Sequence, residues 1–117
     1  MHIGEREAQT AEQFMRTRYS AYAVGDSDYI WRTWHPRTRP DRVTDSGLVW
    51  TRLEIIASVA GGAGDESGEV EFRAHYWEGH RRAFARGECQ QSGTLHERSR
   101  FELRARRWFY VDGELFG

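Results

Sequence analysis

The chain has 117 residues, 38% of them hydrophobic and 14% aromatic, which is enough to form the core of one domain spanning residues 1–117. Its formal net charge is -1, so the composition provides no electrostatic basis for binding nucleic acid or an anionic membrane. No apolar run approaches the roughly 20 residues of a membrane span, and the single cysteine, Cys89, cannot form an internal disulfide. We therefore expect a cytoplasmic protein with neither nucleic acid nor membrane among its partners.

Two helices are predicted in the first third of the chain. Thr10 has a glutamine three residues after it, which has the form of a capping box, so the first helix should begin after Thr10. It should end near Gly25, because glycine readily takes the left-handed conformation that closes a helix. Asp26 can then cap a second helix over 27–34, which the proline that follows would stop.

The second half of the chain is predicted to form a β-sheet. Four segments rich in β-branched and aromatic residues are separated by polar or glycine-rich turns, and they cover 48–59, 69–78, 93–105 and 108–112. Connections of hairpin length join antiparallel neighbours and cannot make parallel crossovers. Helices followed by strands therefore predict an α+β fold, in which the N-terminal helices pack on one face of an antiparallel sheet.

The predicted helix and sheet each turn one charged residue toward the core. At 100° per residue, Arg18 falls within the apolar stripe of the first helix. In the strand LHERSRF, two-residue alternation places Glu97 and Ser99 on the same face as Leu95 and Phe101. An unpaired buried charge is costly, so we predict that Arg18 and Glu97 form an ion pair. Replacing Glu97 by glutamine would then destabilise the protein strongly.

The neighbouring strand, 69–78, should add its even-numbered residues to the face that carries Glu97. The opposite register would place Phe72 and Tyr76 beside Arg98, which is unfavourable for both.

Glu97 has a second interpretation, as a general acid or base in a pocket. On that hypothesis the Tyr22 or Tyr76 hydroxyl would stabilise an oxyanion. We favour the structural pair, because a carboxylate held by an arginine keeps its charge and is a poor proton acceptor near neutral pH.

Three segments of the sequence resemble the YchJ-like family of uncharacterised bacterial proteins: MRTRYSAYAVGDSDYIWRTWHP (15–36), LHERSRF (95–101) and RWFYVDG (107–113). The resemblance implies a nuclear transport factor 2-like (NTF2-like, cystatin-like) α+β fold, in which a curved antiparallel sheet cradles the helices and often leaves a cone-shaped cavity. This superfamily contains isomerases, dehydratases and non-catalytic binding modules, so the fold alone does not assign an activity.

Many relatives carry a cysteine-rich, zinc-binding segment of the SecA C-terminal type ahead of the first matched helix. Here the sequence reads MHIGEREAQT and contains no paired cysteines, which suggests a shorter member or an excised domain. We therefore expect no metal and no cofactor.

The leading hypothesis is a cytoplasmic domain that binds a small molecule or a protein partner through the cone opening, without catalysis. The alternative is a cofactor-free isomerase or dehydratase that uses Glu97 as its acid or base. The residues expected at the pocket are Arg18, Tyr22, Trp34, Tyr76, Glu97 and Ser99. The resemblance also suggests a homodimer through the sheet face, since curved sheets of this class often bury their outer surface.

Overall fold

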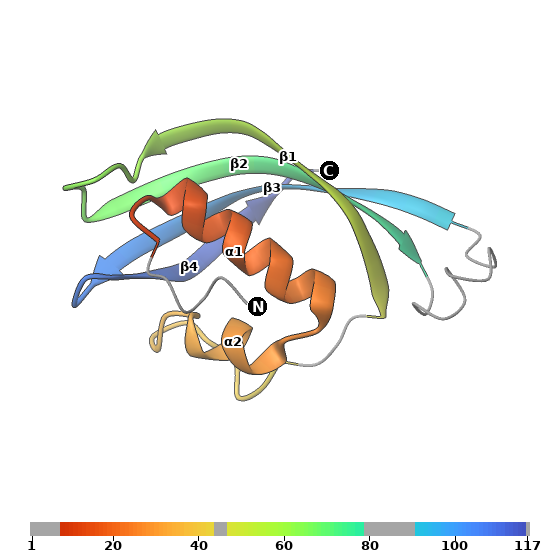
Figure 1. The fold of residues 1–117 in the computed structure, drawn as a ribbon, viewed down its shortest axis with the longest axis horizontal. Coiled ribbons are helices and arrows are strands. Elements are labelled where there is room, and N and C mark those ends of the chain that lie inside the picture. Colours follow the sequence, from red (N-terminus) through yellow and green to blue (C-terminus); the bar gives the residue numbers. More distant parts are fainter. Residues whose placement is uncertain (1–7, 44–46, 79–90, 117) are drawn as a thin grey trace.

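The computed structural model describes residues 8–43, 47–78 and 91–116; Cys89 and the first seven residues, on which some predictions bear, lie outside these ranges. Two helices precede four strands, in the order α1 (Ala11–Val24), α2 (Ser27–Arg32), β1 (Leu48–Ala60), β2 (Ser67–Glu78), β3 (Gln91–Arg104) and β4 (Arg107–Leu115). The strands form one antiparallel sheet of order β1-β2-β3-β4, and α1 lies under its arch with α2 beyond it (Figure 1). The α+β prediction is confirmed. No helix of the described ranges is long and apolar enough to cross a membrane.

Both ends of α1 follow from the local sequence, as predicted. The Thr10 side chain accepts a hydrogen bond from the Gln13 amide at 3.1 Å. The Gln13 side chain accepts from the Gln9 amide at 2.9 Å, one residue earlier than in a regular capping box. At the other end, Gly25 has φ +76° and its amide closes the last turn.

The second helix, α2, is shorter than predicted. Asp26 caps it as expected, but the helix ends at Arg32 rather than at residue 34. The chain that follows pairs with β4, since the His35 amide donates to the Tyr110 carbonyl at 2.7 Å and the Tyr110 amide donates to the Thr33 carbonyl at 2.9 Å. These two bonds end the helix early and tie it to the sheet.

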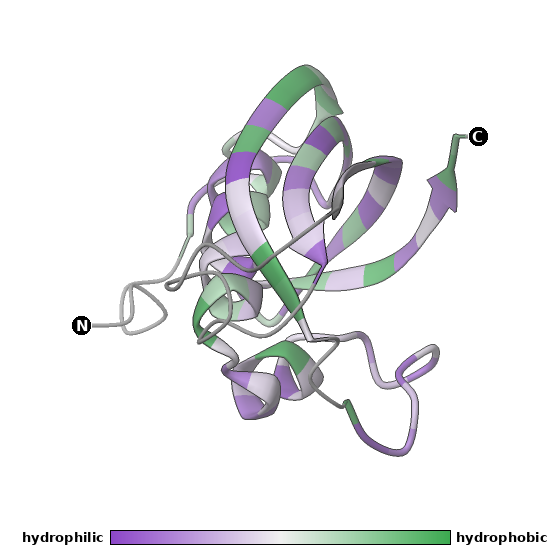
Figure 2. Cartoon of the chain, turned by 90° about the vertical axis from the view of Figure 1, so that its right-hand side faces the viewer, coloured by the Kyte–Doolittle hydropathy of each residue, from purple (hydrophilic) through white to green (hydrophobic). Residues whose placement is uncertain are grey.

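In the pairing of β2 with β3, even-numbered residues of β2 lie opposite odd-numbered residues of β3, the parity that the apolar pattern predicts. Phe72 lies opposite Glu97, and Val70 lies opposite Ser99. Hydrophobic and hydrophilic residues alternate along the strands, as Figure 2 shows. The face that carries Glu97 and Ser99 is therefore the inner face, turned toward α1, as predicted.

One hydrophobic core fills most of the space between α1 and the sheet. Its buried members come from α1 and from three strands: Ala11, Phe14, Met15, Val70, Phe72, Ala74, Phe101 and Trp108. A smaller cluster of Ala21, Tyr29 and Ile30 packs α1 against α2. The Ala11 amide also donates to the Gly61 carbonyl at 2.8 Å, which anchors the start of α1 to the turn between β1 and β2.

The outer face of the sheet carries charged residues in cross-strand pairs. Glu71 Oε2 on β2 lies 2.7 Å from His96 Nε2, and Glu71 Oε1 lies 3.3 Å from Arg98 Nη2 on β3. The hydrogen bond with His96, followed by that from Arg98, lowers the pKa of Glu71. Arg100 on β3 and Asp112 on β4 form a further pair at 2.5 Å. These charged pairs are typical of a sheet face that is exposed to solvent.

Candidate functional site

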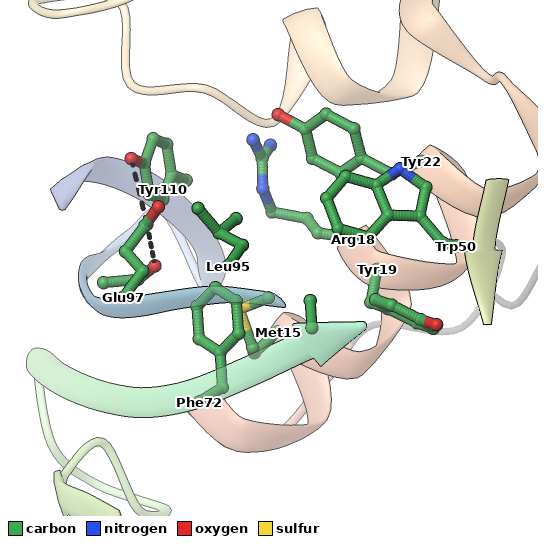
Figure 3. Close-up of a pocket in the computed structure, with 11 residues that line it drawn as sticks. Met15, Arg18, Tyr19, Tyr22, Trp50, Phe72, Leu95, Glu97 and Tyr110 are labelled. Carbon is green, nitrogen blue, oxygen red and sulfur yellow. Dashed lines mark hydrogen bonds between the residues drawn. The ribbon is translucent and has the colours of Figure 1, made fainter. Parts of the chain in front are cut away.

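A cavity of about 160 Å³ lies between α1 and the inner face of the sheet and is partly open to solvent. Its walls are mostly apolar and include Met15, Trp50, Phe72, Ala74 and Leu95. Six side chains with polar groups complete the lining: Arg18, Tyr19, Tyr22, Glu97, Ser99 and Tyr110. In Figure 3 the Arg18 guanidinium lies between the rings of Tyr22 and Tyr110, and Glu97 points toward Tyr110.

Arg18 is buried, with 2% of its surface exposed. Its Nη1 donates to the Ile30 carbonyl at 2.9 Å and to the Thr33 hydroxyl at 2.6 Å. Its Cζ lies 4.8 Å from the ring centroid of Tyr110 and 5.7 Å from that of Trp34. Its Nη2 has no hydrogen-bond partner in the described chain. Burial lowers the pKa of Arg18 and nearby tyrosines partly offset this, but an arginine in a protein stays charged.

The end of α2 explains where Arg18 points. The last carbonyls of a helix have no partner within the helix, and the Ile30 carbonyl belongs to the last turn of α2. Basic side chains commonly bind such carbonyls. Because Ala21 and Ile30 pack α1 and α2 together, the Arg18 side chain reaches the carbonyl end of α2.

Glu97 is held by its own strand and by β4. The Ser99 hydroxyl donates to Glu97 Oε2 at 2.5 Å, and the Tyr110 hydroxyl donates to the same oxygen at 3.4 Å. Glu97 Oε1 accepts no hydrogen bond from the residues that the structure describes. Gly113 leaves the space for this carboxylate, because a Cβ there would collide with it. Burial, followed by the charge of Glu97, raises the pKa of Tyr110, so its hydroxyl stays protonated and remains a donor.

The predicted ion pair between Arg18 and Glu97 is wrong. Both residues lie in the described ranges, and their hydrogen bonds go to other partners. Tyr110 lies between them instead, because its ring contacts the guanidinium and its hydroxyl contacts the carboxylate. Arg18 and Glu97 are therefore two separate polar groups on the wall of one cavity.

Replacing either charged residue is expected to change stability little. Glu97→Gln should alter the free energy of unfolding by less than about 1 kcal/mol, since the amide oxygen can still accept from Ser99. Arg18→Met should also change the free energy of unfolding by less than about 1 kcal/mol. The variant loses two hydrogen bonds, but it no longer has to bury a charged guanidinium. Urea denaturation of both variants and of the double variant measures these effects. A loss of about 3 kcal/mol for Glu97→Gln alone would indicate the ion pair after all.

Two of the predicted pocket residues lie outside the cavity lining. Trp34 packs edge-on against Tyr110, with ring centroids 5.1 Å apart, and its buried Nε1 has no hydrogen-bond partner in the described ranges. Tyr76 packs against Trp50 at 5.4 Å and covers Gly93. The other four predicted residues line the cavity: Arg18, Tyr22, Glu97 and Ser99.

Trp50 is a cavity residue that strand alternation does not predict. A bulge in β1 interrupts its pairing with β2 between Trp50 and Arg52. As a result Trp50 and Leu53, three residues apart, both pack against the core, whereas strict alternation would place them on opposite faces. The signal available in the sequence is size, because a tryptophan in the strand of a small domain is seldom left fully exposed.

Residues 10–113 match the family model described as YchJ, middle NTF2-like domain. UPF0225 protein SCO1677 of Streptomyces coelicolor is 46% identical over 114 residues, which cover 97% of this chain and 81% of the relative. A UPF0225 protein of Chromobacterium violaceum is 43% identical over 113 residues, which cover 91% of this chain and 74% of the relative.

A similar solved structure is the solution structure of RPA3114, a SEC-C motif containing protein from Rhodopseudomonas palustris. The TM-score is 0.75 at 30% sequence identity, and the match covers 96% of this chain and 83% of the other. The family model spans nearly all of the helices and strands described above. This chain therefore belongs to the family of YchJ middle NTF2-like domains.

Proposed function

We propose that this domain binds a small organic molecule in the cavity between α1 and the sheet, without catalysing a reaction. The observation that carries the proposal is the cavity itself, which is mostly apolar and has Arg18 and Glu97 on its wall with no bond between them. An apolar cavity of about 150 Å³ holds a molecule of the size of benzene. A partly open cavity of about 160 Å³ therefore accommodates a ligand of about six to ten non-hydrogen atoms.

A neutral aromatic probe tests this proposal. We expect 4-hydroxybenzamide to shift the amide NMR resonances of residues that surround the cavity on α1 and β3. Ala74→Leu, at a buried lining position, should abolish these shifts, whereas Ala57→Leu on the exposed side of β1 should preserve them. If neither this amide nor 4-hydroxybenzoate perturbs the cavity residues, the binding proposal fails.

The cellular setting and the assembly belong to the same proposal. A cytoplasmic location accords with a chain that has one cysteine. A protein partner would dock at the same opening of the cavity. The homodimer through the sheet face stays a prediction; Ile56 and Val59 on β1 expose apolar surface there, next to the charged pairs. Sedimentation equilibrium would detect it as a species of twice the 13.7 kDa chain mass.

A second candidate is the cofactor-free isomerase. It is favoured by Glu97 Oε1, which accepts no hydrogen bond from the described residues, because a general base needs an oxygen that can accept a proton. Glu97 would remove a proton from a carbon next to a carbonyl and return it to the same or the adjacent position. Tyr22, which lines the cavity, would donate to the enolate oxygen, whereas Tyr76 does not line it. In D₂O, deuterium should then enter cyclohexanone faster with the wild-type domain than with Glu97→Gln. Equal rates would remove this hypothesis.

A further inference from the structure

We propose that the ligand of this cavity is a small carboxylic acid that carries a hydrogen-bond donor at its other end, about one aromatic ring away. Arg18 binds the carboxylate, and Glu97 accepts from the donor. This inference rests on the proposed binding function and specifies the chemical class of the ligand.

Two buried donors beside the cavity have no acceptor in the part of the chain that the structure describes. Arg18 Nη2 and Trp34 Nε1 are the buried side-chain polar atoms without a hydrogen-bond partner in the described chain. They belong to one cluster, because the Arg18 Cζ lies 5.7 Å from the Trp34 ring centroid. Each such donor costs about 1–3 kcal/mol when it stays unpaired. Since Arg18 also lines the cavity, this end of it calls for a ligand group that supplies negative charge and acceptor oxygens.

The remainder of the cavity favours a carboxylate over a phosphate. Glu97 lines the same cavity, so its charge and that of Arg18 sum to zero. A dianionic phosphate would exceed the charge that Arg18 neutralises and would be repelled by Glu97. A carboxylate carries a single charge and forms strong charge-assisted bonds with a guanidinium. Because Ile30 and Thr33 occupy Nη1, the carboxylate binds through Nη2.

The Glu97 end of the cavity requires a donor. Ser99 and Tyr110 both donate to Oε2, and Oε1 has no donor among the described residues, so it can accept from a ligand hydroxyl or ammonium. The Arg18 end and the Glu97 end of the cavity are about one tyrosine side chain apart, because the Tyr110 ring contacts Arg18 and its hydroxyl contacts Glu97. A ligand with its acid and its donor on opposite sides of one ring matches this span, and its body meets apolar walls such as Leu95 and Phe72.

The test uses 4-hydroxybenzoate, which has about ten non-hydrogen atoms and carries both groups on opposite sides of one ring. Its amide, 4-hydroxybenzamide, has the same shape without the charge, and benzoate lacks the donor. Isothermal titration should show that the wild-type domain binds 4-hydroxybenzoate at least about tenfold more tightly than the amide, the usual strength of a charged hydrogen bond. It should also bind 4-hydroxybenzoate more tightly than benzoate.

Variants of Arg18 and Glu97 test which residue binds the carboxylate and which binds the hydroxyl. Arg18→Met should give the acid and the amide equal affinities, whereas Arg16→Met, an exposed residue of the same helix paired with Glu12, should keep the wild-type preference. Glu97→Gln should still bind 4-hydroxybenzoate more tightly than 4-hydroxybenzamide. The difference in affinity between 4-hydroxybenzoate and benzoate should become smaller. Equal binding of acid and amide by the wild-type domain overturns this inference, even if Arg18→Met does not fold. If the acid and the amide bind equally in the cavity, the proposed binding function still holds. If neither probe binds, both the proposed function and this inference fail.

Discussion

Replacing Phe101 by alanine is expected to lower the free energy of unfolding by about 3–5 kcal/mol, the usual cost of deleting a buried aromatic side chain. Phe101 is 2% exposed, and its ring packs edge-on against Phe14 at 5.7 Å and against Tyr110 at 6.0 Å. It therefore joins β3 to α1 on one side and to β4 on the other. The surrounding backbone is held by the sheet, so the space left behind cannot close. Urea denaturation followed by circular dichroism measures the loss.

Phe116→Ala is the matched control for this variant. The same side chain is removed, but Phe116 is 37% exposed and contacts the His96 ring near the end of the chain. We expect a loss below about 1 kcal/mol. Similar losses for the two variants would show that Phe101 does not organise the core.

Gly68→Ala is expected to destabilise the domain by about 3 kcal/mol, at the upper end of the range for overpacking. A Cβ on Gly68 would lie 2.5 Å from the Gly61 Cα and 3.2 Å from the Ala11 Cβ. The first of these atoms is backbone and cannot move aside without shifting the turn. That turn accepts the Ala11 amide, so the start of α1 would be displaced with it. A large fall in melting temperature is the expected observation.

Gly62→Ala tests whether the effect of Gly68→Ala comes from its close approach to Gly61 or from replacing any glycine in this part of the chain. A Cβ on Gly62 would meet only the Asp65 carboxylate, at 3.6 Å. Its stability should be unchanged or slightly higher, because alanine reduces the freedom of the unfolded chain. If Gly68→Ala and Gly62→Ala have the same melting temperature, the contact between Gly61 and Gly68 does not hold α1 in place.

Much of the fold could be predicted because local interactions decide it. The Thr10 cap and the left-handed Gly25 act within one turn of α1, so their residue types are sufficient to place its ends. Strand alternation has a period of two, and it correctly turned Glu97 and Ser99 inward, on the same face as the even-numbered residues of β2.

The errors occurred where two distant segments meet. The second helix ends early because Thr33 and His35 bond to Tyr110, which lies far along the chain on β4. The bulge next to Trp50 changes which residues of β1 face inward, and nothing in a pattern of alternation marks it.

The candidate site also combines features set by local periodicity with features set by contacts between distant segments. The sequence by itself determined that Arg18 and Glu97 look into one interior, because helical and strand periodicity set the direction of each side chain. Only the tertiary structure decided their partners. An arginine side chain is long and rotatable, so the placement of α2 against α1 brings the Ile30 carbonyl within its reach, while Ser99 and Tyr110 hold the carboxylate. In the same placement, Nη2 has no acceptor among the described residues and lies beside an apolar cavity.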